Sequence, residues 1–411
     1  CCFYFSVMNE RDIVSWNRKI IQWGGNFLFS LLIFIIMFDP NNMILNMKNL
    51  FFVLFVAYNI VFFRPDVRYL PHLVIVVSVV LLGYIFAEIQ QNRVDLEVLA
   101  DVLKGFSPLV LLLWVKYYNV IKLSLIPAFL ICLILTVLYM LASSDPVIEG
   151  LIWNFMLEHD NVIMMSHRSF YGIEIFGMYY KSMVCLTFAL GYFYYIFINC
   201  KGRKRYLMFL PFLLGSFAFL VSGTRSSMML PFFIIGLIFY QRVRYTKYVK
   251  YLFYPLFVLF AFMFLFFLVL LATETTESSN MIKYAHLESY IKLFDRHPIY
   301  FLLGQGPGTS FYSSGFGRFT TITEWTYVEL IRNYGIWCIG ILAVILKPLY
   351  TFYQYRRDNL TFVMMVSYLA YLFVAGTNPL LISSTGMLMV LSAYSYERIL
   401  KEQDEGQVRP Y

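Results

Sequence analysis

Long apolar segments follow one another along most of this chain, and they constrain its fold more than any other feature. A helix needs roughly 20 mostly apolar residues to cross the hydrocarbon core of a bilayer. The chain is 60% hydrophobic and 14% charged, whereas soluble domains carry about 25% charged residues. The sequence therefore predicts an all-α polytopic membrane protein with about twelve transmembrane helices. The predicted spans are about 20–38, 49–63, 70–87, 102–115, 121–142, 172–198, 207–221, 228–240, 251–272, 325–346, 360–375 and 380–397.

The distribution of basic residues predicts the orientation of these helices. Lys and Arg concentrate on the cytoplasmic side of membrane proteins. With the N-terminus inside, most of the 32 Lys and Arg residues fall in cytoplasmic segments, and the acid-rich loop "EIQQNRVDLEVLAD" falls outside. We therefore expect cytoplasmic ends at 1–19 and 398–411, and a single transmembrane domain over 20–397. The net charge of +8 follows from this orientation and gives no reason to expect nucleic acid as a partner.

Two of the outer loops are long, at about 143–171 and 273–324. Long loops are uncommon unless they are functional. The second contains "YAHLESYIKLFDRH", and its apolar residues share one helical face: Leu287, Tyr290, Ile291 and Phe294. This spacing predicts an amphipathic helix at the membrane interface, which either packs on the bundle as a lid or contacts a substrate.

Arg225 lies in "VSGTRSSMML", between two apolar runs that are too short to cross the membrane with an exposed tip. This polar tip is therefore expected within the outer leaflet, where non-helical backbone is tolerated only if it lines a cavity or is buried in protein. A charge at that depth is a functional candidate, and the planar guanidinium suits phosphate oxygens. The alternative is a helix cap with an arginine that reaches to the surface.

Further charges surround the start of the sixth span. Arg168 precedes it, and Glu174 and Lys181, seven residues apart, would share one face of its helix. Lys181 would then point toward the same outer cavity, and a buried structural ion pair is the alternative for both residues. Tyr171 is one of several loop aromatics that could offer a face to a sugar ring, although ordinary packing is the simpler interpretation for any one of them.

A glycine-rich loop, "GQGPG", follows Arg296 in the second outer segment. Its glycines, Gly304, Gly306 and Gly308, would permit tight turns and a close approach of the backbone to a ligand. Backbone amides in such a loop can hold an anion. The loop is not a phosphate-binding P-loop, because no Gly-Lys-Ser/Thr follows.

An acid, Glu324, stands where the tenth span begins, in "TEWTYVELIRNYG". Thr323 would cap the helix, and an acid in the first turn is favoured by the helix dipole, which is the simpler interpretation of Glu324. Glu329 and Arg332, three residues apart, would pair with each other.

No metal or nucleotide pattern occurs in the outer loops. His159 and His167 lack the spacing of a zinc site, no Asp-x-Asp is found there, and the chain has no Walker sequence. We therefore expect no metal, no cofactor and no ATP-driven transport.

Four features occur in one order over roughly residues 145–395: "SGTRSS", "LFDRHPIYFLLGQGPG", "TEWTYVELIRNYG" and "AGTNPLLISSTGM". In this order they resemble the bacterial O-antigen and capsular polysaccharide repeat-unit polymerases of the Wzy type, which are related to the O-antigen ligases. The ordered set carries the resemblance, while the N-terminal third matches only as hydrophobic spans.

The resemblance implies a glycosyltransferase of the bacterial inner membrane that works at the periplasmic face without metal or nucleotide sugar. Such an enzyme transfers a growing glycan from undecaprenyl pyrophosphate to a lipid-linked repeat unit. A single displacement would invert the anomeric centre. The expected partners are the lipid-linked oligosaccharide donor and acceptor, membrane lipid and, as a candidate, a chain-length regulator protein.

The family's two arginines match Arg225 and Arg296, and Glu324 stands where the ligase branch has a histidine, which favours a polymerase. Arginines would stabilise the charge that develops on the pyrophosphate leaving group, and a carboxylate would take the proton of the acceptor hydroxyl. The hypothesis is therefore Glu324 as the catalytic base, with pyrophosphate bound by Arg225, Arg296 and Arg168. The candidate substrate-binding residues are Lys181, Tyr171, Gly306, Gly308, Tyr327, Arg332 and Asn378.

Two other functions remain open from the sequence. One is an O-antigen ligase, which differs in its acceptor and is poorly separated by sequence. The other is a transporter or flippase of lipid-linked oligosaccharides. Transporters usually place charges near the midplane and often show inverted repeats, whereas here the charges gather at one face and no repeat is visible.

Overall fold

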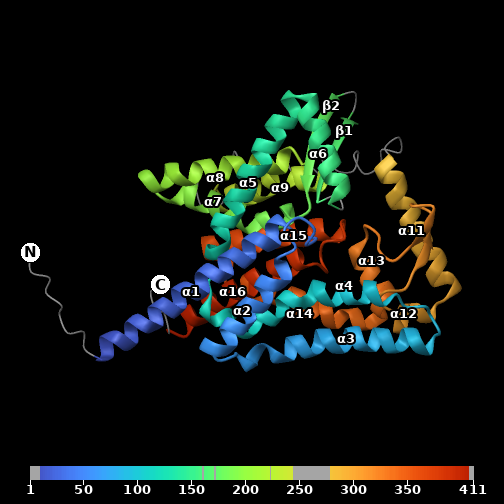
Figure 1. Ribbon diagram of the computed structural model, residues 1–411, viewed down its shortest axis with the longest axis horizontal. Coiled ribbons are helices and arrows are strands. Elements are labelled where there is room, and N and C mark those ends of the chain that lie inside the picture. Colours follow the sequence, from blue (N-terminus) through green and yellow to red (C-terminus); the bar gives the residue numbers. More distant parts are fainter. Residues whose placement is uncertain (1–9, 160–161, 171–172, 223, 244–277, 407–411) are drawn as a thin grey trace, which may run out of the picture.

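The computed structural model describes residues 10–159, 162–170, 173–222, 224–243 and 278–406, and these are mainly helical (Figure 1). Within them, six helical stretches are long and apolar enough to cross a membrane, and four shorter apolar helices accompany them. This agrees with an all-α membrane protein. The total of twelve spans stays a prediction, and the predicted span at about 251–272 lies outside the described residues.

The first part of the chain runs back and forth as a series of helices. Between α3 and α4 the chain makes a short turn, and α4 continues directly into the 3-10 segment η2. The bounds are α1 Glu10–Phe38, α2 Lys48–Phe62, α3 Leu70–Ile89, α4 Leu96–Phe106, η2 Ser107–Tyr117 and α5 Val120–Ser144.

The middle part combines a β-hairpin with short helices. Figure 1 shows α6 and the hairpin standing beyond the ends of the neighbouring helices. The bounds are α6 Pro146–Glu158, β1 Ile163–Phe170, β2 Ile173–Tyr180, η3 Met183–Leu186, α7 Thr187–Asn199, α8 Arg203–Leu220 and α9 Arg225–Val243.

The last part begins with the predicted interfacial helix, α11, and a small hairpin, and ends with three longer helices. The bounds are α11 Ser278–Arg296, α12 Ile299–Leu303, β3 Phe311–Ser313, β4 Arg318–Thr320, α13 Thr326–Tyr334, η4 Gly335–Trp337, α14 Cys338–Gln354, α15 Asn359–Gly376 and α16 Ser384–Asp404. Helix α16 is buried over most of its length and packs against η2, α14 and α5, so it forms the centre of the bundle.

The single helix predicted over 172–198 is wrong in its first part. Strand β2 occupies its beginning and pairs antiparallel with β1, with Ser169 opposite Glu174. A run rich in Ile, Phe and Tyr suits a strand as well as a helix, and apolarity alone does not distinguish the two. Glu174 and Lys181 therefore do not share a helix face: Glu174 lies in β2, and Lys181 follows the strand in a turn.

The predicted tenth span is interrupted at Gly335, which separates α13 from α14. Its φ of 55° lies in the left-handed region. A Cβ there would meet the Leu302 carbonyl oxygen at 2.3 Å. Only glycine accommodates both the conformation and this close approach, so the turn between the two helices is encoded locally.

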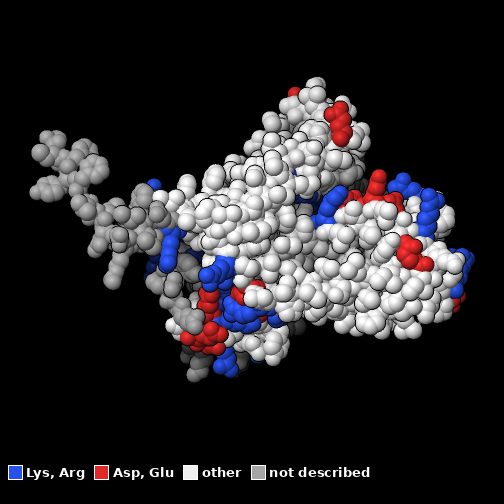
Figure 2. All heavy atoms as spheres, turned by 60° about the horizontal axis from the view of Figure 1, so that its bottom comes forward, with Lys and Arg blue, Asp and Glu red and all other residues white. Residues whose placement is uncertain are grey.

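Two pairs of segments that are predicted on the same side of the membrane contact each other. At one end, the Tyr117 hydroxyl donates to the Arg64 carbonyl at 3.2 Å. At the other, the Asn92 amide donates to the Gln305 carbonyl at 2.8 Å. In Figure 2 the charged side chains gather toward two ends of the visible face, with a broad uncharged surface between them. These two contacts agree with the predicted alternation of the helices. Which end of the bundle faces the cytoplasm stays a prediction.

Candidate functional site

Glu324 lies in the loop between β4 and α13, just before the helix begins at Thr326. The acid in the first helical turn is Glu329 and not Glu324, so the helix-dipole explanation of Glu324 loses its basis. The Glu324 Oε2 atom lies 3.2 Å from Nζ of Lys283, with the two side chains 34% and 30% exposed. Its Oε1 atom has no hydrogen-bond partner among the described residues. Glu324 is thus a half-exposed carboxylate with one oxygen available to a ligand.

Lys283 belongs to α11, and the sequence analysis did not single it out. The signal that could have revealed it is a polar stripe at helical spacing formed by Lys283, His286 and Tyr290. These residues face the hairpin and the loop before α13: the Trp325 indole donates to the Lys283 carbonyl at 3.0 Å. Of the predicted apolar face, Tyr290 is buried in these contacts whereas Ile291 is 63% exposed, and the fully buried His286 lies outside that face.

His286 anchors α11 to the β3–β4 hairpin. Its Nδ1 atom lies 2.5 Å from the Ser313 hydroxyl, and its Nε2 atom is buried without a partner among the described residues. The next turn adds a bond from the Ser314 backbone amide to the Ser289 hydroxyl at 2.8 Å. Burial lowers the pKa of His286, because a charged imidazole would lose its hydration there.

Glu329 and Arg332 pair on α13, as their spacing predicts, at 2.8 Å between Nε and Oε2. Arg332 is fully buried, and its remaining donors reach the side chain of Gln305 at 2.8 Å and the carbonyls of Thr309 and Thr321 at 3.0 and 2.7 Å. These contacts fasten the two ends of the glycine loop and hairpin to one helix. The role they support for Arg332 is structural, since a fully bonded and buried guanidinium has no surface to offer a substrate.

Tyr290 completes this buried network, which we call the Arg332 knot: Tyr290, Gln305, Thr309, Thr321, Thr323, Glu329 and Arg332. The Tyr290 hydroxyl donates to the Glu329 carboxylate and lies 2.5 Å from the Thr323 hydroxyl. The backbone amide of Thr323 donates to the same carboxylate oxygen at 3.0 Å. Burial, reinforced by the charge of Glu329, raises the pKa of Tyr290, so its hydroxyl stays protonated as a donor.

The glycines of the loop approach other parts of the protein closely, in place of the ligand that was predicted. Gly306 has φ 108°, and a Cβ there would lie 2.3 Å from that of Ala87 in α3. Gly308 has φ 80°, and a Cβ there would lie 2.7 Å from the Asp95 carbonyl oxygen. The Gly308 carbonyl accepts from the Asp95 amide at 2.9 Å. The α3–α4 turn therefore occupies the space beside these two glycines in which a ligand was predicted.

The first turn of α13, which begins two residues after Glu324, contacts a segment that lies far away in the sequence. The Thr326 hydroxyl donates to the Asn378 carbonyl at 2.6 Å, and the Tyr327 hydroxyl donates to the Leu372 carbonyl at 2.8 Å. A Cβ at Gly376 would meet the Tyr327 ring at 2.3 Å. The loop after α15 thus packs on the first turn of α13.

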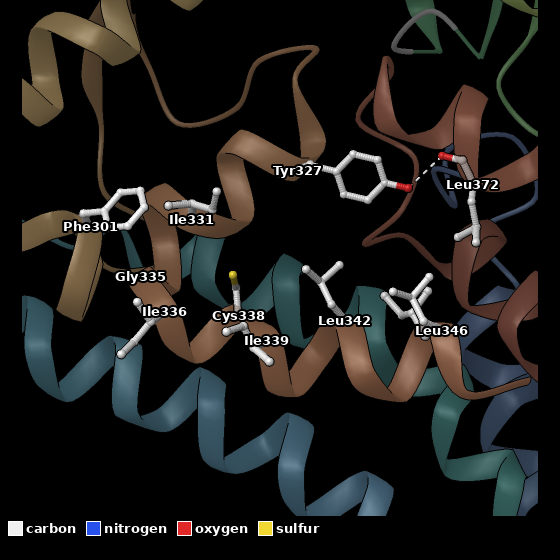
Figure 3. A pocket seen from close by; sticks show the side chains of 11 residues that line it. Phe301, Tyr327, Ile331, Gly335, Ile336, Cys338, Ile339, Leu342, Leu346 and Leu372 are labelled. Carbon is white, nitrogen blue, oxygen red and sulfur yellow. Dashed lines mark hydrogen bonds between the residues drawn. The ribbon is translucent and has the colours of Figure 1, made fainter. Parts of the chain in front are cut away.

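An apolar groove with a cavity volume of about 470 Å³ runs along α14 below Tyr327 (Figure 3). In the figure the Tyr327 ring extends across toward Leu372, and side chains of α14 form the opposite wall. Ile339 is 65% exposed, so the groove opens onto the outer surface of the bundle. The lining residues are Phe301, Tyr327, Ile331, Gly335, Ile336, Cys338, Ile339, Leu342, Ile345, Leu346 and Leu372.

Of the three predicted arginines, Arg296 has a described side chain, and it does not lie beside Glu324. Arg296 is exposed and ends α11, so a rise of about 1.5 Å per residue puts its Cα roughly 20 Å from that of Lys283. The expectation that Arg296 and Glu324 share one pocket is therefore wrong, because the chain between them folds back along the whole length of α11. Arg225 opens α9 and Arg168 lies in β1.

The other predicted residues near the hairpin are only partly described. The side chains of Arg225 and Arg168, and Tyr171 as a whole, lie outside the described residues. Lys181 lies beside the base of the hairpin, where its amide donates to the Val162 carbonyl at 3.1 Å. The structure thus pairs Glu324 with Lys283, and it packs the loop of Asn378 on the first turn of α13, whose Tyr327 lines an apolar groove. Neither a family model, nor a curated protein, nor a solved structure matches this chain.

Proposed function

We propose that this protein is a polysaccharide repeat-unit polymerase, for O-antigen or capsule, of the bacterial inner membrane. It would take a growing glycan from undecaprenyl pyrophosphate and transfer it to a lipid-linked repeat unit at the periplasmic face. The sequence resemblance to the Wzy-type polymerases suggests this class. The structural observation that supports it best is a half-exposed carboxylate, Glu324, three residues before Tyr327, which lines an apolar groove.

The proposed glycosyl transfer uses the carboxylate of Glu324 and the apolar groove. A lipid-linked sugar has a hydrocarbon tail, which an apolar groove open to the bilayer can hold. The acceptor hydroxyl attacks the anomeric carbon of the donor and gives its proton to the open oxygen of Glu324. The bond between that carbon and the pyrophosphate oxygen breaks, and its electron pair leaves with the pyrophosphate. One such displacement inverts the anomeric centre.

Cationic groups would stabilise the leaving pyrophosphate, as oriented charges do wherever negative charge develops in a transition state. Arg225 and Arg168 remain the proposed ligands from the sequence, whereas the position of Arg296 removes it from the immediate surroundings of Glu324. Tyr327 on the first turn of α13, and Asn378 packed against that turn, are the proposed contacts of the sugar-bearing end. Arg332, Gly306 and Gly308 hold the loop that carries Glu324 in place.

The test is deletion of the gene in the bacterium that carries it, followed by gel analysis of its surface glycan. A polymerase predicts that the ladder disappears while a single repeat unit remains on the surface. A ligase would leave polymer on the lipid and none on the acceptor, and a flippase would leave no glycan at the surface. Either of these results would contradict the proposal.

Complementation then tests the site. Glu324→Gln should fail to restore the ladder, because the amide cannot accept the hydroxyl proton. Glu288→Gln is the matched control, since Glu288 forms an exposed ion pair with Lys292 on α11. It should restore the ladder fully. A normal ladder with Glu324→Gln would exclude Glu324 as the base.

A further inference from the structure

Lys283 is held both through its backbone and through its side chain. Its carbonyl accepts from the Trp325 indole at 3.0 Å, and its ammonium lies 3.2 Å from the carboxylate of Glu324. Backbone and side chain of one residue thus contact two consecutive residues of the loop before α13. The geometry of the Glu324 carboxylate is therefore tied to α11.

Helix α11 is itself held firmly against this loop. His286 bonds to Ser313, and Tyr290 bonds to Thr323 and Glu329, one and two helical turns further along. These side chains are buried, and burial strengthens such polar contacts because water no longer competes for them. Lys283 therefore presents its ammonium from a rigid support, whereas an isolated surface lysine would sample many rotamers.

We propose that Lys283 is a positioning residue for Glu324: it holds one carboxylate oxygen so that the other faces the acceptor hydroxyl. The inference rests on the proposed function, because it assigns Lys283 a role only if Glu324 is the base. It adds a residue that acts through Glu324 and does not itself touch the substrate. Misplacement of a catalytic group by about 1 Å can cost on the order of 100-fold in rate, so holding the carboxylate matters even where the ion pair adds little to folding.

The same helix provides a matched control. Lys292 pairs with Glu288 at 2.6 Å, and both side chains are exposed, at 57% and 60%. Removing either lysine deletes one charge and one ion pair from α11, but only Lys283 contacts the loop of Glu324. A difference between the two variants therefore reports on Glu324 and not on the general charge of the helix.

The experiment uses purified full-length protein in nanodiscs and a lipid extract from the deletion strain, which supplies the lipid-linked repeat units. Initial rates of polymer formation at a series of extract concentrations give kcat and KM separately. Lys283→Met should lower kcat by about 10- to 100-fold with KM changed less than about threefold. Lys283→Arg should stay within about fivefold of the wild type, and Lys292→Met should be unchanged.

Three results would overturn the proposal. These are wild-type kcat in Lys283→Met, an equal loss in Lys283→Met and Lys292→Met, or a rise in KM with kcat unchanged, which would make Lys283 a direct substrate ligand. If Lys283→Met does not accumulate in the membrane, Lys283→Gln is measured in its place with the same expectations.

Glu324→Gln, measured in parallel, distinguishes a failure of the positioning role of Lys283 from a failure of the proposed function. Loss of activity in Glu324→Gln together with wild-type activity in Lys283→Met would refute the positioning role and leave the proposed function intact. Full activity in Glu324→Gln would instead remove the assigned base, and with it the reason for a positioning lysine.

Discussion

Two ion pairs have carboxylates only five residues apart, Glu324 and Glu329, and they differ in exposure and in the number of their contacts. Glu329 and Arg332 are 8% and 0% exposed, and the guanidinium makes hydrogen bonds to three further residues. Glu324 and Lys283 are 34% and 30% exposed, and one carboxylate oxygen has no protein partner among the described residues. The first pair lies on α13, and the second joins α11 to the loop before α13.

The difference shows how the same residue types divide into structural and chemical roles. A buried charge must be satisfied on all sides to be tolerated, and so it has nothing left for a ligand. A half-exposed carboxylate held from one side keeps an oxygen for a substrate. The Arg332 knot therefore fixes the loop, whereas Glu324 is the group proposed for proton transfer. Variants of the two pairs should therefore differ in their effect on stability.

Arg332→Met should have the largest effect, because it leaves the Glu329 carboxylate buried without its partner. Breaking a buried pair in this way costs about 3–5 kcal/mol. The free energy of opening can be measured from trypsin cleavage within 278–334 across a urea series, on the purified protein in detergent. The double variant Arg332→Met/Glu329→Gln should recover part of the loss. A single variant as resistant as the wild type would mean that the knot does not hold the loop.

Gly306→Ala should come next. The new Cβ would require a positive φ and would lie 2.3 Å from the Cβ of Ala87, and strain together with overpacking costs about 2–4 kcal/mol. Gly317→Ala is the control, because it also has a positive φ, 63°, but meets no atom within 4 Å. It should cost about 1 kcal/mol. Equal effects in the urea series would show that the contact with α3 is not tight.

His286 should make the stability of the α11 contacts depend on pH. Burial lowers its pKa in the folded state below the unfolded value of about 6.5. The folded state therefore binds fewer protons, so its stability is complete above about pH 6.5 and falls as the pH drops toward the lowered pKa, by at most about 1.4 kcal/mol per pH unit. The charges around it are Glu324, Glu329 and Lys283.

The comparison with His286→Gln isolates this contribution, since other carboxylates titrate in the same range. The urea series on wild type and variant between pH 7.5 and 5 should diverge on the acidic side, with the wild type losing more. Parallel curves would show that His286 is not the group responsible.

Much of the fold could be predicted from local patterns, and the failures have a common cause. The apolar runs found most of the helices, and the i, i+3 spacing found the Glu329–Arg332 pair. The β1–β2 hairpin was missed because an apolar run of aromatic and branched residues fits either structure. The buried face of α11 was missed because its partners, Ser313, Thr323 and Glu329, lie in a segment that folds back on it.

The candidate site was predictable only in part for the same reason. Glu324, Tyr327 and Asn378 were named from sequence features, and the structure packs Asn378 on the first turn of the helix that carries Tyr327. Lys283 was not, because nothing local indicates that a lysine on one helix meets a carboxylate some forty residues away. The glycine loop was assigned a ligand because its real partner, the α3–α4 turn, is more than 200 residues distant in sequence, as the contact of Asn92 with Gln305 illustrates.

Glu324→Gln should have the smallest effect on stability and the most complete effect on activity. Half-exposed ion pairs contribute about 0–1 kcal/mol, because water and salt screen the charges and two long side chains must be ordered. The same urea series should therefore shift by less than about 1 kcal/mol, whereas the glycan ladder disappears. If the variant instead destabilised the loop as much as Arg332→Met, both acids would belong to one structural network. The distinction between a supporting pair and a reactive pair would then fail, and with it the assignment of Glu324 as the base.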